Sequence, residues 1–316
     1  MERCVVFKIS AGPNIGMGHL MRASVLSQAI KASGLTTILV TESNISASVE
    51  LFEIRDKFSF YMSDEELLNQ DVKKSILVID SYLLTSRDSI LNLDFEKKIA
   101  VVDNGFTPDY KVMDRIIQEP KLKDNFATQV DLGNLIVDPF FAAHRSLRHI
   151  STRHSKINLV VNSGGYDETN FCEVIIRFLA NSNLDVNVCY FSRNKIKLTD
   201  SRFQHFSPGP QYRNIIVNSD FVISTCGTSI WELADMAIPF AVAQAALNQK
   251  PNYDFLEKHN LAFTLGKYYN NIWEIDFEKI LSVIGEAKYL NQLSRKLFYQ
   301  VKPSDSNKLV DEFILN

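Results

Sequence analysis

Residues 9–22 read Ile-Ser-Ala-Gly-Pro-Asn-Ile-Gly-Met-Gly-His-Leu-Met-Arg and decide how the first half of the chain folds. The apolar run Cys4–Ile9 leads into this stretch and predicts a buried strand. Apolar residues then recur at helical spacing and predict a helix that ends at Gly34. Free backbone N–H groups at the start of such a helix favour an anion, and the phosphate of a nucleotide sugar would suit this place.

The loop between this strand and this helix differs from the common phosphate loops. Gly16 and Gly18 let its backbone turn tightly and approach a ligand, and His19 and Arg22 follow in the first helical turn. The loop lacks both the Gly-Lys-Ser/Thr of a Walker motif and the glycine spacing of the dinucleotide fingerprint. The plain alternative is that His19 forms only a local hydrogen bond at the helix N-terminus.

Length and composition predict a globular protein of two domains, since the chain has 316 residues. The net charge of −3 and the pI of about 6.1 argue against a nucleic-acid partner. Four scattered cysteines lack metal-binding spacing and predict reduced thiols, and no metal or cofactor is expected. No signal peptide or membrane-spanning run is evident, so we expect a cytoplasmic protein without stable membrane insertion; its oligomeric state is open.

The first half alternates apolar strands with helical stretches. Continuous β-branched runs indicate strands of a parallel sheet at 36–41, 75–80 and 98–103, with shorter candidates at 116–117 and 135–137. Polar residues just past such strands face the ligand crevice, and here they are Ser10, Asp80, Tyr82, Asp103 and Asn104. A plain turn at residues 103–105 explains the last two equally well.

The second half repeats this alternation after a polar, basic stretch at 144–156. The composition of that stretch favours a solvated linker over a metal or anion patch. Strands are predicted at 157–162, 186–191, 221–224 and 239–243, and helices at about 170–180, 230–236, 248–259 and 277–316, the last broken by Pro303. We therefore predict an α/β protein of two doubly wound Rossmann-like domains, 1–150 and 151–316, which face one another across a cleft.

Two glycine-rich loops of the second half are candidate diphosphate sites, because each opens a helix. They are Ser163-Gly164-Gly165-Tyr166-Asp167 and Cys226-Gly227-Thr228-Ser229. Glu232, one turn into the second helix, can accept both ribose hydroxyls or merely complement the helix dipole. The amides of Asn248 and Gln249 can meet a sugar, although Asn248 can also be a simple helix cap.

Taken in order, these motifs resemble a family of nucleotide-sugar enzymes. The run from Ser224 to Phe240, with Asn248-Gln249 downstream, is similar to the donor site of GT-B enzymes. Gly16-Met-Gly-His19, Val78-Ile-Asp-Ser-Tyr82 and Ser163-Gly-Gly-Tyr-Asp167 match in the same order. Among GT-B enzymes, the chain resembles the UDP-sugar hydrolases of pseudaminic acid biosynthesis. These are grouped with spore-coat polysaccharide biosynthesis protein G and are related to the lipid II-forming N-acetylglucosaminyltransferase.

The resemblance implies that the C-terminal domain binds UDP near Gly164, Gly165, Asp167, Gly227, Thr228, Ser229, Glu232 and Gln249. It also implies that His19, beside Gly16 and Gly18, acts without a metal as the general base that activates water at the anomeric carbon. Arg22 would stabilise the departing diphosphate, and Tyr82 and Asn248 would orient sugar and water. Asp80 or Asp103 would fix the tautomer of the histidine.

Three departures from the family pattern bear on the substrate. Asn104 replaces a usual second Asp, Tyr166 replaces a usual Thr or Ser, and residues 133–141 keep little of a segment that shapes the sugar pocket. The sugar and its anomer therefore stay open. The predicted function is hydrolysis of a UDP-activated amino or deoxy sugar for a surface glycan of the pseudaminic or nonulosonic acid type. The alternative is an inverting GT-B glycosyltransferase with a UDP-sugar donor and a hydroxyl acceptor.

Overall fold

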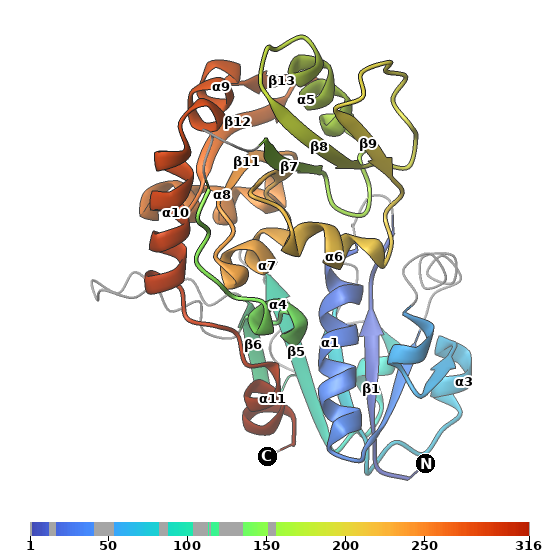
Figure 1. Cartoon of the computed structure of the whole chain (residues 1–316). Helices are drawn as coiled ribbons and strands as arrows, with labels where there is room; N and C mark the ends of the chain where they lie inside the picture. Colours follow the sequence, from blue (N-terminus) through green and yellow to red (C-terminus); the bar gives the residue numbers. More distant parts are fainter. Residues whose placement is uncertain are drawn as a thin grey trace. The chain divides into compact units, whose positions relative to one another are not determined.

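The structure is a computed structural model that describes residues 2–12, 17–40, 54–81, 88–103, 113, 115–119, 135–150 and 156–315. The chain forms two compact units, each built on its own sheet (Figure 1). Unit 1 takes its residues from 1–123, 132–139 and 304–316, and unit 2 takes them from 124–131 and 140–303. Residues 140–150, which the sequence-based boundary assigned to the first domain, thus belong to unit 2, and the C-terminal residues belong to unit 1.

Unit 1 contains a six-stranded parallel sheet with the strand order β3-β2-β1-β4-β5-β6. Its strands are β1 (Cys4–Ile9), β2 (Thr36–Val40), β3 (Phe60–Met62), β4 (Ile76–Asp80), β5 (Lys97–Asp103) and β6 (Arg115–Glu119). Its helices are α1 (Gly18–Ala32), η1 (Arg55–Lys57), α3 (Asp64–Leu68), η2 (Ser89–Asn92), α11 (Ser306–Leu309) and η5 (Val310–Leu315). The strand order reverses between β1 and β4: β2 and β3 are added on one side of β1, and β4, β5 and β6 on the other. Doubly wound sheets bind ligands at such a switch point.

Unit 2 contains a seven-stranded sheet with the order β13-β12-β11-β10-β7-β8-β9. Its strands are β7 (Ile157–Asn162), β8 (Val186–Phe191), β9 (Phe203–Phe206), β10 (Phe221–Thr225), β11 (Phe240–Gln244), β12 (Phe263–Tyr269) and β13 (Ile272–Ile275). Its helices are α4 (Pro139–Ala143), α5 (Phe171–Ala180), α6 (Gln211–Val217), α7 (Ser229–Met236), η4 (Leu247–Gln249), α8 (Lys250–His259), α9 (Phe277–Gly285) and α10 (Ala287–Gln300). From β9 to β12 the order is that of unit 1, so the switch point lies between β7 and β10; β13 adds antiparallel to β12.

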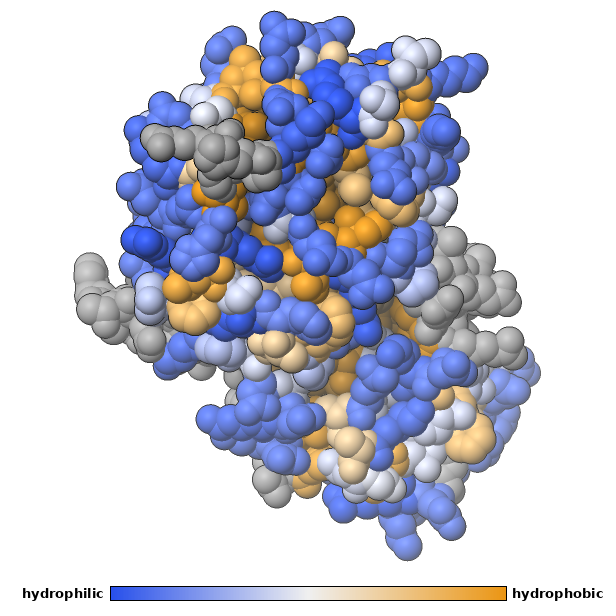
Figure 2. Space-filling view, in the orientation of Figure 1, coloured by the Kyte–Doolittle hydropathy of each residue, from blue (hydrophilic) through white to orange (hydrophobic). Residues whose placement is uncertain are grey.

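Apolar side chains of the strands and helices form a separate core in each unit. In unit 1, β1, β2 and β4 pack Val6, Ile38 and Leu77 against Leu67 of α3. In unit 2, the equivalent cluster packs the central strands against the apolar face of α5, which carries Ile175, Ile176 and Leu179. The face drawn in Figure 2 is mostly hydrophilic, with apolar residues in scattered groups. None of the helices in the described ranges is long and apolar enough to cross a membrane.

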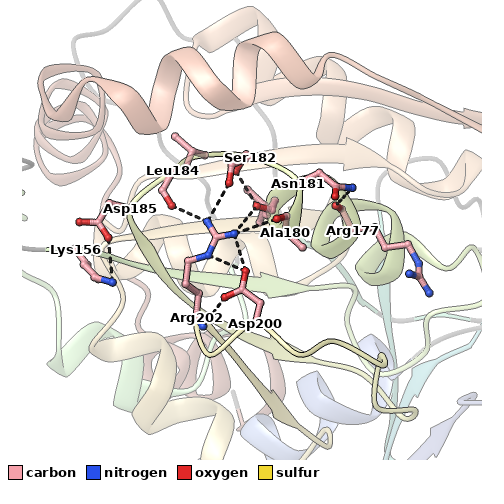
Figure 3. A network of polar contacts seen from close by, with 10 residues as sticks. Lys156, Arg177, Ala180, Asn181, Ser182, Leu184, Asp185, Asp200 and Arg202 are labelled. Atoms are coloured by element: carbon pink, nitrogen blue, oxygen red, sulfur yellow. Dashed lines mark hydrogen bonds and ion pairs between the residues drawn. The ribbon is translucent and has the colours of Figure 1, made fainter.

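Arg202 fixes the end of α5 in unit 2 (Figure 3). Its guanidinium donates to the carbonyls of Leu184 (2.8 Å), Ala180 (3.1 Å) and Ser182 (3.2 Å) and to the carboxylate of Asp200 (2.7 Å). These carbonyls belong to the last turn of α5 and to the loop that follows, so a positive charge meets the negative end of the helix dipole. The contacts hold α5 and β8 in the positions that present the loops at the opposite edge of the sheet.

Two sequence-based expectations are wrong. Residues 135–137 are buried but form no strand, and the carbonyl of Val137 accepts from the hydroxyl of Ser306 (2.9 Å) where a neighbouring strand would otherwise bond. The stretch from residue 144 to 150 is no solvated linker. Arg145 donates to the carbonyls of Asp235, Leu297, Phe298 and Val301, and thereby caps the C-terminal ends of α7 and α10. Residues 151–155 lie outside the described part of the chain.

Candidate active site

The switch point of unit 1 brings together the ends of β1 and β4 and the start of α1. The amide of Ser10, just past β1, donates to the carbonyl of Asp80 (3.2 Å), and the hydroxyls of Ser10 and Ser81 contact each other. These contacts join the ends of the two strands. Asp80 is the last residue of β4, so its side chain lies at the edge where α1 begins.

His19 and Arg22, in the first turns of α1, both contact Asp80. Nδ1 of His19 meets Oδ1 of Asp80, 61 residues further along the chain. Arg22 donates two hydrogen bonds to the same carboxylate, from Nε to Oδ2 (2.9 Å) and from Nη2 to Oδ1 (2.8 Å). All three residues are buried: His19 is 3% exposed, Asp80 2% and Arg22 3%. The long-range partner rules out the reading in which His19 forms only a local hydrogen bond.

This arrangement determines the chemistry open to the imidazole. Nδ1 of His19 also lies 2.9 Å from Nη2 of Arg22. Because an ionised carboxylate only accepts hydrogen bonds, the tautomer of His19 that can act as a base here has its proton on Nδ1, facing Asp80, and its lone pair on Nε2. Burial alone would raise the pKa of Asp80, but the guanidinium of Arg22 and the adjoining imidazole of His19 outweigh it and hold the pKa well below its usual value. Asp80 therefore stays ionised and can stabilise an imidazolium, as the acid does in a Ser-His-Asp triad.

The first glycine loop of unit 2 is largely occupied by its own side chains. Asn162 accepts from the amide of Gly164 (3.1 Å), whose φ of +86° favours glycine. Asp167 accepts from the amides of Phe171 (2.8 Å) and Cys172 (2.9 Å). Its carboxylate thus fills the positive N-terminus of α5 that the sequence assigned to a diphosphate. This gives Asp167 a capping role.

The second loop leaves its helix terminus open. No side chain in the described part of the chain caps the N-terminus of α7, which starts at Ser229. Thr225 links the two loops, because its hydroxyl donates to the carbonyl of Ser163 (3.1 Å). Gln249 reaches the same place: a Cβ built on Gly227 would lie 3.9 Å from its Nε2. The amides of this loop are therefore the better anion site of the two.

Glu232 lies one turn into α7, where the sequence placed a ribose acceptor. Its neighbour is the phenol of Tyr212 at the start of α6, a residue that the sequence analysis missed. The only sequence signal was the Pro208-Gly-Pro210 turn before Tyr212, which marks a loop at the carboxyl edge of the sheet. Asn248 lies on η4 and is exposed. The N-cap of α8 is Gln249, so the reading of Asn248 as a helix cap is wrong.

A second residue missed from the sequence is Arg193, which follows β8. Its guanidinium lies over the ring of Tyr166, 3.9 Å from the ring centroid. Tyr166 directly follows Gly164-Gly165, so the stacking holds a positive charge beside the first glycine loop. Arg193 has no carboxylate partner among the described residues, and it is exposed.

The remaining predicted positions can be placed only in part. Gly18 is the first residue of α1, and Gly165 lies in the loop after β7. Gly16, Tyr82 and Asn104 lie outside the described residues, as does the side chain of Asp103. Among the residues that the structure describes, no group of three or more His, Cys, Asp or Glu could hold a metal ion.

Comparison with protein-family models and with curated proteins finds no match. Solved structures do match over nearly the whole chain. Acinetobacter baumannii MurG is 10% identical, with a TM-score of 0.65 over 98% of this chain and 99% of that one. Arabidopsis thaliana UGT89C1 complexed with UDP is 13% identical, with a TM-score of 0.64 over 98% of each chain. The spinosyn rhamnosyltransferase SpnG complexed with thymidine diphosphate is 13% identical, with a TM-score of 0.61 over 98% of this chain and 99% of that one.

At these identities the likeness establishes the fold and no narrower family. The expected α/β architecture, with two Rossmann-like units, is confirmed by both strand orders and by these matches. This chain therefore has the GT-B fold.

Proposed function

We propose that this chain is a glycosyltransferase that moves a sugar from a UDP-sugar donor to an acceptor hydroxyl. The observation that carries the proposal is the buried His19–Asp80–Arg22 cluster at the switch point of unit 1. In a GT-B fold, a base at this point suits the acceptor side of the reaction. The UDP part of the donor is assigned to the loops of unit 2.

The chemical step needs one proton to move and one bond to exchange. Nε2 of His19 takes the proton of the acceptor O–H, and the oxygen attacks the anomeric carbon of the donor. The bond from that carbon to UDP breaks, and UDP leaves with the electron pair. Asp80 accepts from Nδ1 throughout and stabilises the imidazolium, and Arg22 holds Asp80 in place. Arg22 thus acts through Asp80 and does not need to touch the diphosphate.

The features of unit 2 support binding of a nucleoside diphosphate. The open N-terminus of α7, at Gly227, Thr228 and Ser229, offers amides and a positive dipole end to the phosphates. Glu232 would accept from the ribose hydroxyls, and Gln249 would add an amide donor beside Gly227. Asn248, exposed on η4, is available to orient the sugar.

Hydrolysis is the second candidate, with water in place of the acceptor hydroxyl. The order of motifs from Gly16 to Gln249, which resembles that of UDP-sugar hydrolases, favours it. The roles of His19, Asp80 and Glu232 are the same in both reactions. The product would then be a free amino or deoxy sugar for a surface glycan.

The decisive experiment measures UDP released from a panel of UDP-sugars by chromatography, first in water alone and then with candidate acceptors. Release only with an acceptor, together with a new glycoside, supports the transferase. Release in water, with a free sugar identified by NMR, supports the hydrolase, and the first anomer seen distinguishes inversion from retention. A protein that neither binds nor releases UDP contradicts both.

Replacing Arg193 by glutamine is expected to weaken UDP binding by about 5- to 30-fold and to leave uridine binding nearly unchanged. The reason is that Arg193 is held by Tyr166 beside the glycine loop, where it can neutralise phosphate charge. Calorimetric titrations with UDP and with uridine at low and high salt measure the effect, which salt should reduce. Lys195→Gln removes a charge from the same exposed loop and serves as the control. Equal losses for both ligands would show that Arg193 does not act on the phosphates.

A further inference from the structure

The phenol of Tyr212 is an unusual group in unit 2. Its ring packs edge-on against Phe191, with 5.3 Å between centroids. Its hydroxyl is shielded from solvent, yet it has no well-directed hydrogen bond within the described residues. A buried hydroxyl in that state costs free energy, about 1–3 kcal/mol, unless a functional arrangement uses it.

Three polar side chains adjoin the hydroxyl of Tyr212: Glu232 and Ser229 from α7, and Asn162 from the end of β7. Burial raises the pKa of this phenol well above its usual value, and the charge of Glu232 raises it further. The phenol therefore keeps its proton and is a donor. Of the three neighbours, only the carboxylate of Glu232 is a hydrogen-bond acceptor that cannot donate. Figure 1 shows that the two helices involved, α6 and α7, are neighbours at this edge of the sheet.

We propose that Tyr212 is a positioning residue that donates its hydroxyl hydrogen to Glu232, holds that carboxylate for the 2′-hydroxyl of the donor's ribose, and so makes the site select ribonucleotides over deoxyribonucleotides. This inference rests on the proposed binding of UDP by unit 2. A carboxylate on a glutamate has several rotamers, and a buried donor that selects one of them lowers the entropy lost on binding. The ribose hydroxyl then meets an acceptor that is already in place.

The GT-B fold alone does not decide between ribonucleotides and deoxyribonucleotides. The solved structures that match this chain include one complexed with UDP and one complexed with thymidine diphosphate. UDP carries a 2′-hydroxyl and thymidine diphosphate does not. Side chains such as Glu232 and Tyr212 must therefore decide which nucleotide a given GT-B chain accepts.

The test is calorimetric titration of UDP and of 2′-deoxy-UDP into the full chain. We expect the wild type to bind UDP about 10- to 100-fold more tightly than 2′-deoxy-UDP, since a hydroxyl that donates to a carboxylate contributes that much. Tyr212→Phe keeps the ring packed on Phe191. It should reduce the preference for UDP over 2′-deoxy-UDP about five- to tenfold, mostly by weakening the binding of UDP. Glu232→Gln should lower the ratio as well, and adding Tyr212→Phe to it should change the ratio no further.

Tyr190→Phe is the matched control. It removes another phenol hydroxyl from the same unit, one bonded to the backbone of Ile196 (3.2 and 3.4 Å), and should leave the ratio unchanged. A ratio that Tyr212→Phe does not alter overturns the inference while UDP binding still stands. Should Tyr212→Phe not fold, a wild-type ratio near one, or a ratio unaffected by Glu232→Gln, overturns it equally. A wild type that binds no UDP overturns the proposed function and the inference together.

Discussion

Replacing His19 by asparagine is expected to lower kcat by about 10²- to 10⁴-fold, the usual contribution of a positioned general base. The Kd of UDP should change by less than about twofold, because the residues assigned to UDP lie in unit 2 and His19 lies in unit 1. Asparagine keeps a polar group near Asp80 but offers no basic nitrogen at the place of Nε2. Steady-state kinetics with the best donor and acceptor, and a UDP titration, measure the two quantities.

His205→Asn is a suitable control, because it removes a histidine of unit 2 whose Nε2 lies 2.8 Å from the carbonyl of Ser192. It should leave kcat within about threefold of the wild-type value, since it removes a single backbone contact within unit 2. Unchanged turnover in the His19 variant would remove this residue from the mechanism. A large loss of UDP affinity in that variant would instead mean that His19 binds the nucleotide.

The sequence predicted the central strands well and the outer ones poorly. Runs such as Cys4–Ile9 and Ile157–Asn162 are β-branched and continuous because both faces of a central strand are covered, and the structure confirms both ranges. Strands β3 and β9 have only three and four residues, and little in so short a run separates a strand from a loop. The hairpin of β12 and β13 turns at Asn270-Asn271, both with positive φ, and this turn signal was overlooked.

The sequence predicted the parts of the site whose residues lie close together in the chain, but not the contacts between distant segments. The glycine loop singled out His19 and Arg22 because both follow it within one helical turn. Which acid meets them depends on β4 pairing with β1, a contact between segments about 60 residues apart that spacing alone does not specify. Tyr212 was missed for a similar reason, because its place next to Glu232 depends on how α6 and α7 pack together. The capping of α5 by Asp167 could not be read from the sequence, because a loop acid and a helix-capping acid look alike there.

Replacing Asp80 by asparagine is expected to impair both activity and stability. The amide occupies nearly the same volume but carries no charge, so the buried guanidinium of Arg22 loses its compensation. Breaking a buried pair in this way costs about 3–5 kcal/mol of the free energy of unfolding. The same change removes the acceptor that fixes the tautomer of His19, which should lower kcat by about 10²- to 10⁴-fold. Urea denaturation and steady-state kinetics at a temperature where the variant is folded measure the two effects.

The pH dependence of the free energy of unfolding tests whether the charge of Asp80, rather than its shape, stabilises the fold. Because the folded protein holds the pKa of Asp80 below its unfolded value of about 3.9, the stabilisation is complete above that pH and is lost as the pH falls below it. The free energy of unfolding of the wild type should therefore decline more steeply below about pH 4 than that of Asp80→Asn. Asp254→Asn, which breaks an exposed pair with Lys250, should cost less than about 1 kcal/mol and leave kcat unchanged.

The double variant His19→Asn/Asp80→Asn tests whether the two residues act as one unit. If Asp80 acts on catalysis only through His19, its replacement should lower kcat no further once His19 is gone, although the loss of stability should persist. Additive losses in kcat would mean that Asp80 contributes to the reaction by another route, such as direct contact with the sugar. An Asp80→Asn protein with wild-type kcat and an unchanged urea midpoint would contradict the assignment of Asp80 altogether. Stability that survives without the charge would also show that Arg22 finds its compensation elsewhere in unit 1.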